Sequence, residues 1–175
     1  MVDENTSSIN LERMGRGEYG ELYAPHVLEI YKMYVDMADK VSSRRQSANS
    51  YFLTLNTAII AILSYIEQCT SQVISSKYSW IVSFAGIILS YSWYRLIRSY
   101  KDLNSGKFKV VHHIERMLPI APYDAEWKAI GEGKDKEMYL PFTKVEIRVP
   151  WIFLFVHAFV FIQSFPWKKV WQFIT

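Results

Sequence analysis

Cysteine is scarce throughout this sequence, and charge is missing from three parts of it. The single cysteine, Cys69, excludes an internal disulfide. Lys, Arg, Asp and Glu make up 21% of the chain, yet none of them occurs in residues 46–66, 78–94 or 149–167. Each segment is about as long as the ~17–25 residues that a helix needs to cross a bilayer. The sequence therefore predicts that lipid surrounds them; a soluble domain with a large aromatic core is the alternative.

Motifs for catalysis and metal binding are also missing. The sequence contains no Gly-rich phosphate loop, no Ser-His-Asp set and no zinc-spaced cysteines. The nearest approach to a metal site is His112, His113 and Glu115, which is more typical of a surface histidine pair because no further ligand stands at helical spacing. We expect neither enzymatic activity nor a metal or other cofactor.

Residues 1–24 lack the apolar run of a cleavable signal peptide. They are polar and rich in glycine, which predicts a flexible lead. The first membrane-spanning helix is then expected to act as an uncleaved signal anchor. The net charge of +3 is too small to indicate duplex nucleic acid as a partner.

Residues 25–66 have the pattern of one long helix. Pro25 suits a first helical turn, and no Gly or Pro interrupts residues 26–66. We divide this helix into a stalk, 25–48, and a first membrane-spanning part, 49–66, with a break near Ser42-Ser43 as the alternative. An apolar stripe at alternating spacings of four and three follows the stalk and predicts the interface between copies. Its residues are Val27, Tyr31, Tyr34, Ala38 and Val41.

A polar loop, 67–77, and a second apolar helix, 78–94, complete a predicted membrane hairpin. Lys and Arg collect on the cytoplasmic flanks of membrane spans. Bases stand before the first span and after the second. The stalk and the N-terminus are therefore predicted to be cytoplasmic, and the loop external.

The rest of the chain is predicted as a cytoplasmic insert, 95–148, a third apolar helix, 149–167, and a tail, 168–175. The insert is expected to be a helix followed by a looped stretch, because prolines and glycines punctuate its second half. In that stretch Asp124 could cap a short helix from Ala125. The third helix is short for a span, so we favour crossing but keep an interfacial or re-entrant helix as the alternative.

Polar side chains in the first span give the sharpest functional hypothesis. Asn49 and Asn56 lie seven residues apart and share one helix face. In a ring of copies this face could line a wet path with an apolar constriction that gates by dewetting. The candidate pore-lining residues are Asn49, Leu53, Asn56, Ile60 and Leu63. A helix contact that fixes register without a pore is the alternative.

Basic residues are predicted to gather beside the bilayer, where they could bind anionic headgroups or, added over several copies, a phosphate-rich ligand. They are Arg44, Arg45, Arg95, Arg98, Lys101, Lys107 and Lys109.

The run from Leu28 to Asn56 resembles the signature of the small RipA-like octameric membrane proteins of bacteria, which are also similar to SLATT-type two-span effectors of anti-phage systems. Supporting pieces are KFKVVHHIERMLP at 107–119, YDAEW at 123–127 and VPWIF at 149–153. The resemblance covers roughly residues 26–155. It implies an oligomeric protein of the bacterial inner membrane with a helical cytosolic part, and no family catalytic residue.

The resemblance also implies two functions. SLATT-type proteins are regarded as pore-forming effectors, often paired with a nucleotidyltransferase, whereas RipA-like proteins are tied to stress adaptation and intracellular growth. We therefore expect an all-α membrane protein of four to eight copies that forms a channel gated from the cytosol by a nucleotide or a single-stranded oligonucleotide. The alternatives are a non-conducting scaffold and, third, a membrane enzyme acting on lipid or peptidoglycan precursors through His112, His113 or Glu115.

Overall fold

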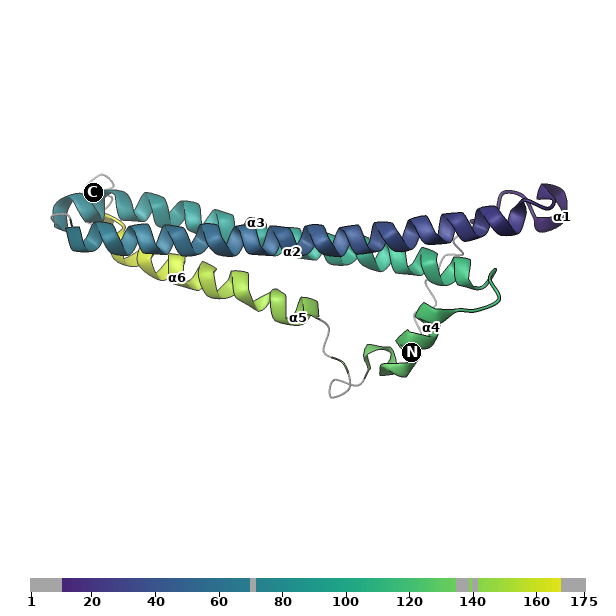
Figure 1. Cartoon of the computed structure of the whole chain (residues 1–175). Coiled ribbons are helices and arrows are strands. Elements are labelled where there is room, and N and C mark those ends of the chain that lie inside the picture. The colour runs from purple at the N-terminus through teal and green to yellow at the C-terminus, as the bar shows by residue number, and fades with distance from the viewer. Residues whose placement is uncertain (1–10, 70–71, 135–138, 140–141, 168–175) are drawn as a thin grey trace. The chain divides into compact units, whose positions relative to one another are not determined.

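A computed structural model describes residues 11–69, 72–134, 139 and 142–167 (Figure 1). Across these ranges the secondary structure is helical and contains no strand. The elements are α1 (Arg16–Tyr19), α2 (Tyr23–Cys69), α3 (Gln72–Glu115), α4 (Pro122–Ala129), the 3-10 helix η1 (Gly131–Gly133), α5 (Phe142–Glu146) and α6 (Arg148–Ser164). Three helical segments are long and apolar enough to cross a membrane, which confirms the predicted all-α membrane class.

Helix α2 is continuous, as the sequence predicted. It begins at Tyr23, two residues before Pro25, and passes through Ser42 and Ser43 without a break. Continuity follows from composition, because no residue in this range lacks a backbone donor or favours a left-handed conformation after the first turn. The alternative of two helices is therefore wrong.

Helix α3 begins earlier than the sequence predicted and joins the second apolar helix to the helix expected at the start of the insert. The polar loop expected over 67–77 is largely helical, since α2 continues to Cys69 and α3 begins at Gln72. At its other end α3 passes Arg95 and the exposed Gly106 and ends only at Glu115. A helix-interior glycine costs about 1 kcal/mol, and apolar packing of the residues that follow offsets this cost: Val111 and Ile114 are both buried.

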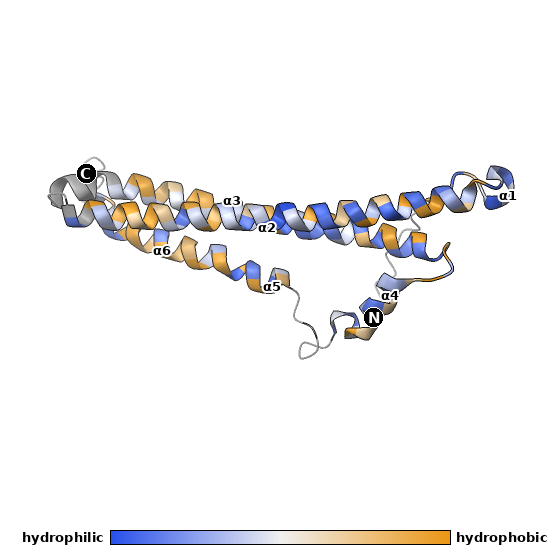
Figure 2. Ribbon diagram, viewed as in Figure 1, coloured by the Kyte–Doolittle hydropathy of each residue, from blue (hydrophilic) through white to orange (hydrophobic). Residues whose placement is uncertain are grey.

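The chain forms two compact units, which we describe separately. The stalk unit comprises residues up to Ser42 together with 102–140, and the membrane unit comprises residues 43–101 and those from 141 onward. In the hydropathy view α6 is mostly coloured as hydrophobic, with a few blue residues between, as expected of a segment largely surrounded by lipid (Figure 2). Residues 1–10 of the predicted lead, 1–24, and the tail 168–175 lie outside the described residues; the rest of the lead contains α1 and the first residues of α2.

Side chains of α2 and α3 join these helices within the stalk unit. Ala38 and Val41 are buried. The Tyr31 hydroxyl donates to Glu115 Oε1 at 3.0 Å, and Lys107 Nζ lies 5.5 Å from the centre of the Tyr34 ring. Residues of the predicted stripe thus contact α3 of the same copy, and the role of the stripe as the interface between copies stays a prediction.

Glu115 holds α4 against the end of α3. Its carboxylate accepts the backbone N–H of Tyr123 at 2.9 Å and that of Asp124 at 3.0 Å, which are free donors of the first turn of α4. The residue preceding α4, Ala121, offers no side-chain cap. The predicted cap was therefore wrong: α4 starts at Pro122, Asp124 lies inside its first turn, and the capping carboxylate comes from α3.

The role of Glu115 can be tested by Glu115→Leu. This change removes a buried, charged acceptor from two amides and one phenol, which we expect to destabilise the docking of α4 by about 2–4 kcal/mol. Native-state proteolysis at Lys128, which is exposed on α4, measures that loss in the detergent-solubilised protein. Glu126→Gln, an exposed acid on the same helix, serves as the control and should leave cleavage unchanged. Equal resistance of Glu115→Leu and the parent protein would contradict the assignment.

Candidate functional site

A buried polar cluster joins the three helices of the membrane unit. Asn56 of α2 and His157 of α6 both have 0% of their surface exposed, and Ser90 of α3 is equally buried. Asn56 Oδ1 accepts the Ser90 hydroxyl at 3.0 Å and lies 3.2 Å from His157 Nε2. Asn56 Nδ2 donates to the carbonyl of Phe52 at 2.8 Å. One amide therefore fastens both α3 and α6 to α2.

The second asparagine of the first span is also used within the protomer. Asn49 Oδ1 accepts the indole N–H of Trp93 at 2.8 Å, and the Trp93 ring stacks on Phe52 with centroids 5.9 Å apart. These bonds support the alternative that the sequence left open, a helix contact that fixes register. The role of Asn49 and Asn56 in lining a pore stays a prediction.

The other three predicted pore-lining residues divide between the inside and the surface of the protomer. Leu63 is buried, Ile60 is half-buried and Leu53 is 45% exposed. A pore face built from all five residues would have to include side chains that one copy already covers. The protomer leaves a different face of the first span open.

Opposite Asn56, α2 carries a row of small, mostly hydroxylated residues, all of them exposed. We call it the hydroxyl face; it consists of Ser43, Ser47, Ser50, Thr54, Thr57, Ala61 and Ser64, at alternating spacings of four and three. The hydroxyls of Ser47, Thr57 and Ser64 donate to the carbonyls four residues earlier at 2.8–3.1 Å. The heptad-like spacing of the hydroxyl face is visible in the sequence. Spacing alone does not show which face of the first span the protomer leaves exposed, so the hydroxyl face was not predicted.

In the uncharged segments of the other two spanning helices, the exposed large side chains are apolar or aromatic apart from Gln163 of α6. They are Ile81, Phe84, Ile88 and Tyr91 on α3, and Trp151, Ile152, Phe155, Val156, Phe159 and Ile162 on α6. Such faces suit hydrocarbon. The hydroxyl face of α2 differs from them, with Tyr51, Ile62 and Tyr65 exposed beside it.

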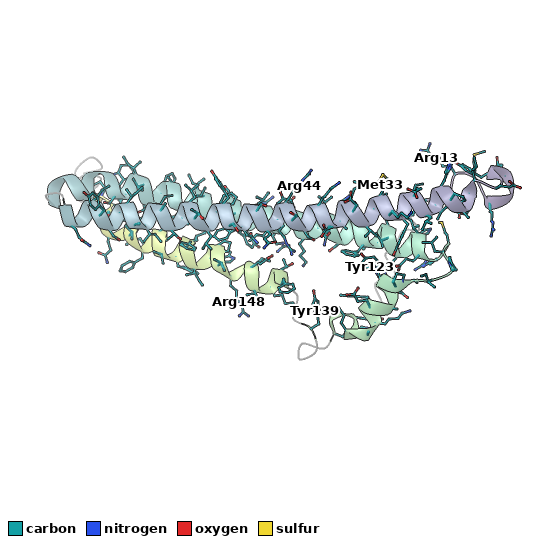
Figure 3. All side chains as sticks on the ribbon, viewed as in Figure 1. Arg13, Met33, Arg44, Tyr123, Tyr139 and Arg148 are labelled. Atoms are coloured by element: carbon teal, nitrogen blue, oxygen red, sulfur yellow. The ribbon has the colours of Figure 1, made fainter. Side chains whose placement is uncertain are left out.

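The predicted basic residues of the membrane unit lie in two kinds of environment. Arg45 is half-buried, with Nε 3.6 Å from Glu146 Oε2 and a guanidinium N–H directed at Thr143 Oγ1 at 3.5 Å. Exposed bases are Arg44, which projects from α2 in Figure 3, and Arg95, Arg98 and Lys101 of α3. Arg45 therefore anchors α5, and the four exposed bases remain available to an anion. Lys107, already placed over Tyr34, and the exposed Lys109 belong to the stalk unit.

His112, His113 and Glu115 are not assembled as a metal site. His112 Nδ1 lies 3.7 Å from Asp124 Oδ1, Glu115 caps α4, and His113 is half-buried. A hydrogen bond from Lys128 at 2.6 Å holds the pKa of Asp124 below its usual range, so its carboxylate is charged beside His112 at neutral pH. Within the described ranges no group of three or more His, Cys, Asp or Glu is placed to hold a metal ion.

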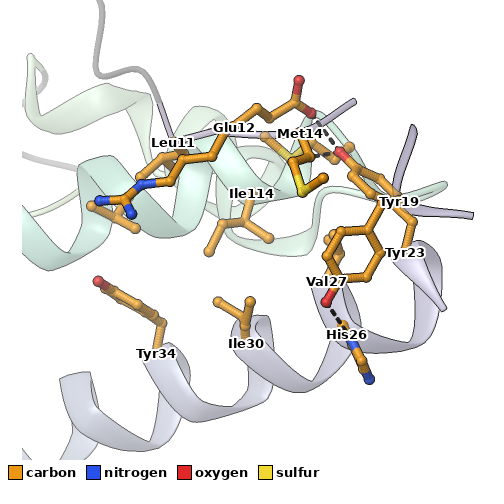
Figure 4. A pocket seen from close by; sticks show the side chains of 13 residues that line it. Leu11, Glu12, Met14, Tyr19, Tyr23, His26, Val27, Ile30, Tyr34 and Ile114 are labelled. Atoms are coloured by element: carbon orange, nitrogen blue, oxygen red, sulfur yellow. Dashed lines mark hydrogen bonds between the residues drawn. The ribbon is translucent and has the colours of Figure 1, made fainter. Parts of the chain in front are cut away.

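A pocket of about 470 Å³ lies in the stalk unit, between the N-terminal segment and helices α2 and α3 (Figure 4). Tyr19 and Tyr23 form one side, where the Tyr19 hydroxyl is 2.7 Å from His26 Nδ1. Val27, Ile30, Tyr34, Val110, Ile114 and Met117 line the apolar part, and Leu11, Glu12, Arg13 and Met14 complete the lining. No spacing pattern in the sequence indicated this pocket, because residues far apart in the chain form it.

The polar cluster can be tested by Asn56→Leu. The change leaves a Ser90 hydroxyl and an imidazole N–H without an acceptor at bilayer depth, where each such bond contributes about 1 kcal/mol. We expect a lower thermal transition for the solubilised protein by circular dichroism. Ser92→Ala, which removes an exposed hydroxyl bonded only to Ile88 O, is the control. An unchanged transition in Asn56→Leu would show that the cluster does not hold the helices together.

Comparisons with known proteins place the chain in a family. Searches of curated proteins and of solved structures found no match. The family model described as the octameric membrane protein family (8xMP) matches residues 28–166, which include α2, α3, α4 and α6. With a match over most of its length, and with membrane-spanning helices in the fold, this chain belongs to the octameric membrane protein family.

Proposed function

We propose that the assembled protein is a membrane channel whose path is lined by the hydroxyl face of α2. The observation that carries this proposal is the contrast between the exposed faces of the spanning helices. Within the uncharged segments, the exposed large side chains of α3 and α6 are apolar or aromatic except Gln163, whereas α2 exposes a row of small, mostly hydroxylated residues. A face of that kind is better suited to water or to another protein than to hydrocarbon.

The continuation of the row favours water over a dry protein contact. At the same spacing it reaches Lys40 and Asp36, which form an exposed ion pair at 2.6 Å. The row thus passes from charged side chains on the stalk to hydroxyls in the uncharged segment. A path that ions enter from water needs this succession, and pores are lined by such hydrogen-bonding groups.

Octameric assembly, the property named by the family, supplies the ring that such a path requires. Eight copies would present eight hydroxyl faces to one axis, with α3 and α6 turned toward lipid. Leu53, exposed at the edge of the row, is the candidate for an apolar constriction.

The proposed function also includes the membrane in which the protein lies, its orientation there and the signal that opens the channel. We place the protein in the bacterial inner membrane with the N-terminus cytoplasmic, because bases flank the stalk side of both hairpin helices. Opening is proposed to respond to a nucleotide or oligonucleotide made by a partner nucleotidyltransferase in phage defence, as in the SLATT-type effectors that the sequence resembles. Tyrosine rings and Arg13 in the stalk pocket suit a nucleobase with a phosphate, and its volume suits a small ligand.

A non-conducting scaffold is the second candidate, and a specific surface favours it. Ile30, Met33 and Met37 form an exposed apolar strip on the stalk part of α2, and Met33 projects from the helix in Figure 3. Apolar strips exposed to water mark sites of protein association. The strip could hold a cytosolic partner, or it could join copies of this chain in place of the predicted stripe.

Cysteine accessibility separates the channel from the scaffold. In a Cys69→Ser background, Thr57→Cys and Ala61→Cys place thiols on the hydroxyl face, and Ile62→Cys places one beside it. We expect a cationic methanethiosulfonate reagent to abolish most of the conductance of Thr57→Cys and Ala61→Cys in planar bilayers, and to leave Ile62→Cys unaffected. The native His, Arg and Lys residues do not react with this reagent.

Two results would overturn the channel. One is the absence of conductance with nucleotides and short oligonucleotides present, and the other is equal modification of Ile62→Cys and Thr57→Cys. Inaccessible thiols at 57 and 61 that instead form disulfides between copies would assign the row to a dry contact, as the scaffold requires.

Assembly through the apolar strip is tested by the double variant Met33→Glu/Met37→Glu. At a contact between copies, the introduced carboxylates would lose their hydration and repel one another. We therefore expect dissociation to smaller species in native mass spectrometry. Leu28→Glu makes the same chemical change on another face of α2 and should leave the assembly intact. Retention of the full oligomer by the double variant would free the strip for a different partner.

A further inference from the structure

His157 lies flat on the backbone of α3 in the membrane unit. A methyl group added at Gly86 would meet three atoms of the imidazole ring at 2.5–2.6 Å, including Nδ1. Only glycine leaves room for the ring at this position. The close approach brings a titratable side chain into the middle of a helix contact from which solvent is excluded.

The hydrogen bonds of Asn56 fix which imidazole nitrogen carries the proton. Its Nδ2 donates to Phe52 O at 2.8 Å, so Oδ1 is the amide atom that faces Ser90 and His157. Because Oδ1 is an acceptor only, the contact of 3.2 Å to His157 Nε2 is a hydrogen bond only if Nε2 is protonated. In the neutral ring Nδ1 then holds a lone pair and no hydrogen.

Two buried polar atoms beside Gly86 have no partner among the described residues. One is His157 Nδ1, and the other is the hydroxyl oxygen of Ser83, one helical turn before Gly86 on α3. An unpaired polar group in an apolar interior costs about 1–3 kcal/mol. Natural membrane proteins keep such polar groups chiefly where they serve a function.

We propose that His157 Nδ1 is a proton-binding site in the membrane, and that proton uptake loosens α6 from the α2–α3 pair. The lone pair on Nδ1 accepts the proton, and the ring becomes an imidazolium with both nitrogens as donors. Nε2–H keeps its bond to Asn56, whereas the new Nδ1–H faces Gly86, which has no side chain to accept it.

Among the residues that the structure describes, no charged group packs against the ring to neutralise the added charge. The elements packed against it present Asn56 from α2 and Gly86, Ser83 and Ser90 from α3, none of which titrates. The uncharged segments 46–66, 78–94 and 149–167 contain no carboxylate. A cation without a counter-ion in a low-dielectric contact is unfavourable, so proton binding and tight packing of α6 oppose each other.

The switch acts on helix packing and does not depend on whether α2 lines a channel. If the channel exists, movement of α6 would change the packing behind the pore helix. If it does not, acid would still loosen α6. The two proposals can therefore fail separately.

Nitrogen NMR of the protein labelled at its four histidines tests the binding site directly. His157 is assigned as the signal missing from His157→Gln, whose side-chain amide can still donate to Asn56 but takes up no proton. At about pH 8 we expect the Nε2–H tautomer, with Nδ1 at the chemical shift of a bare nitrogen, and conversion to imidazolium on acidification. The Nδ1–H tautomer, or a ring that stays neutral down to about pH 4, would overturn the proposal.

Distances between spin labels test the consequence. In a Cys69→Ser background, labels at Ile88→Cys on α3 and Phe159→Cys on α6 occupy exposed positions, and dilution with unlabelled copies isolates distances within one protomer. We expect the distance to lengthen by a few ångströms on acidification, and to stay constant in His157→Gln. The same acid shift in both proteins, or no shift in either, would refute the switch.

Discussion

The packing of the membrane unit depends on the side-chain amide of Asn56. Inside hydrocarbon no water can replace a lost partner, so each polar group must find one in the protein. Asn56 Nδ2 donates to a carbonyl of its own helix. Asn56 Oδ1 accepts hydrogen bonds from Ser90 and His157, which come from the two neighbouring helices. The surrounding apolar contacts could be satisfied in several registers, whereas these bonds fit one. The register of α2, α3 and α6 follows from that geometry.

Because the amides of Asn49 and Asn56 bond inside the protomer, they are not available on its outer surface. Asn49, like Asn56, bonds within the copy, so the small polar side chains exposed on α2 between residues 47 and 64 are hydroxyls. In the uncharged segments of α3 and α6, the exposed large side chains are apolar or aromatic apart from Gln163. One copy therefore has two faces suited to lipid and one that is not. For a member of a family that assembles as an octamer, the third face is the one to turn toward an axis or a neighbour.

Residue patterns predicted the helices of this fold better than they predicted which side chains contact one another. Three charge-free segments and the absence of Gly and Pro from residues 26–66 were enough for the spans and for the unbroken α2. The stalk stripe correctly marked a buried face, but periodicity says only that a face is covered, and here α3 of the same copy covers it. Asn56 likewise stood out, while its partner His157 is 101 residues away. The capping of α4 by Glu115 depends on a chain reversal that no spacing rule describes.

The difference between amides and hydroxyls explains how α2 can serve both packing and function. An asparagine in lipid depends on a hydrogen-bond partner from another helix, so the helix face that carries it must pack against that neighbour. A serine or threonine can donate to the carbonyl one turn earlier, as Ser47, Thr57 and Ser64 do, and then needs nothing from outside. Such a residue can then face either protein or water at little cost. A helix with amides on its fixed face and self-satisfied hydroxyls on the other can change its outer neighbours while its inner register holds, which is the property a gated assembly needs.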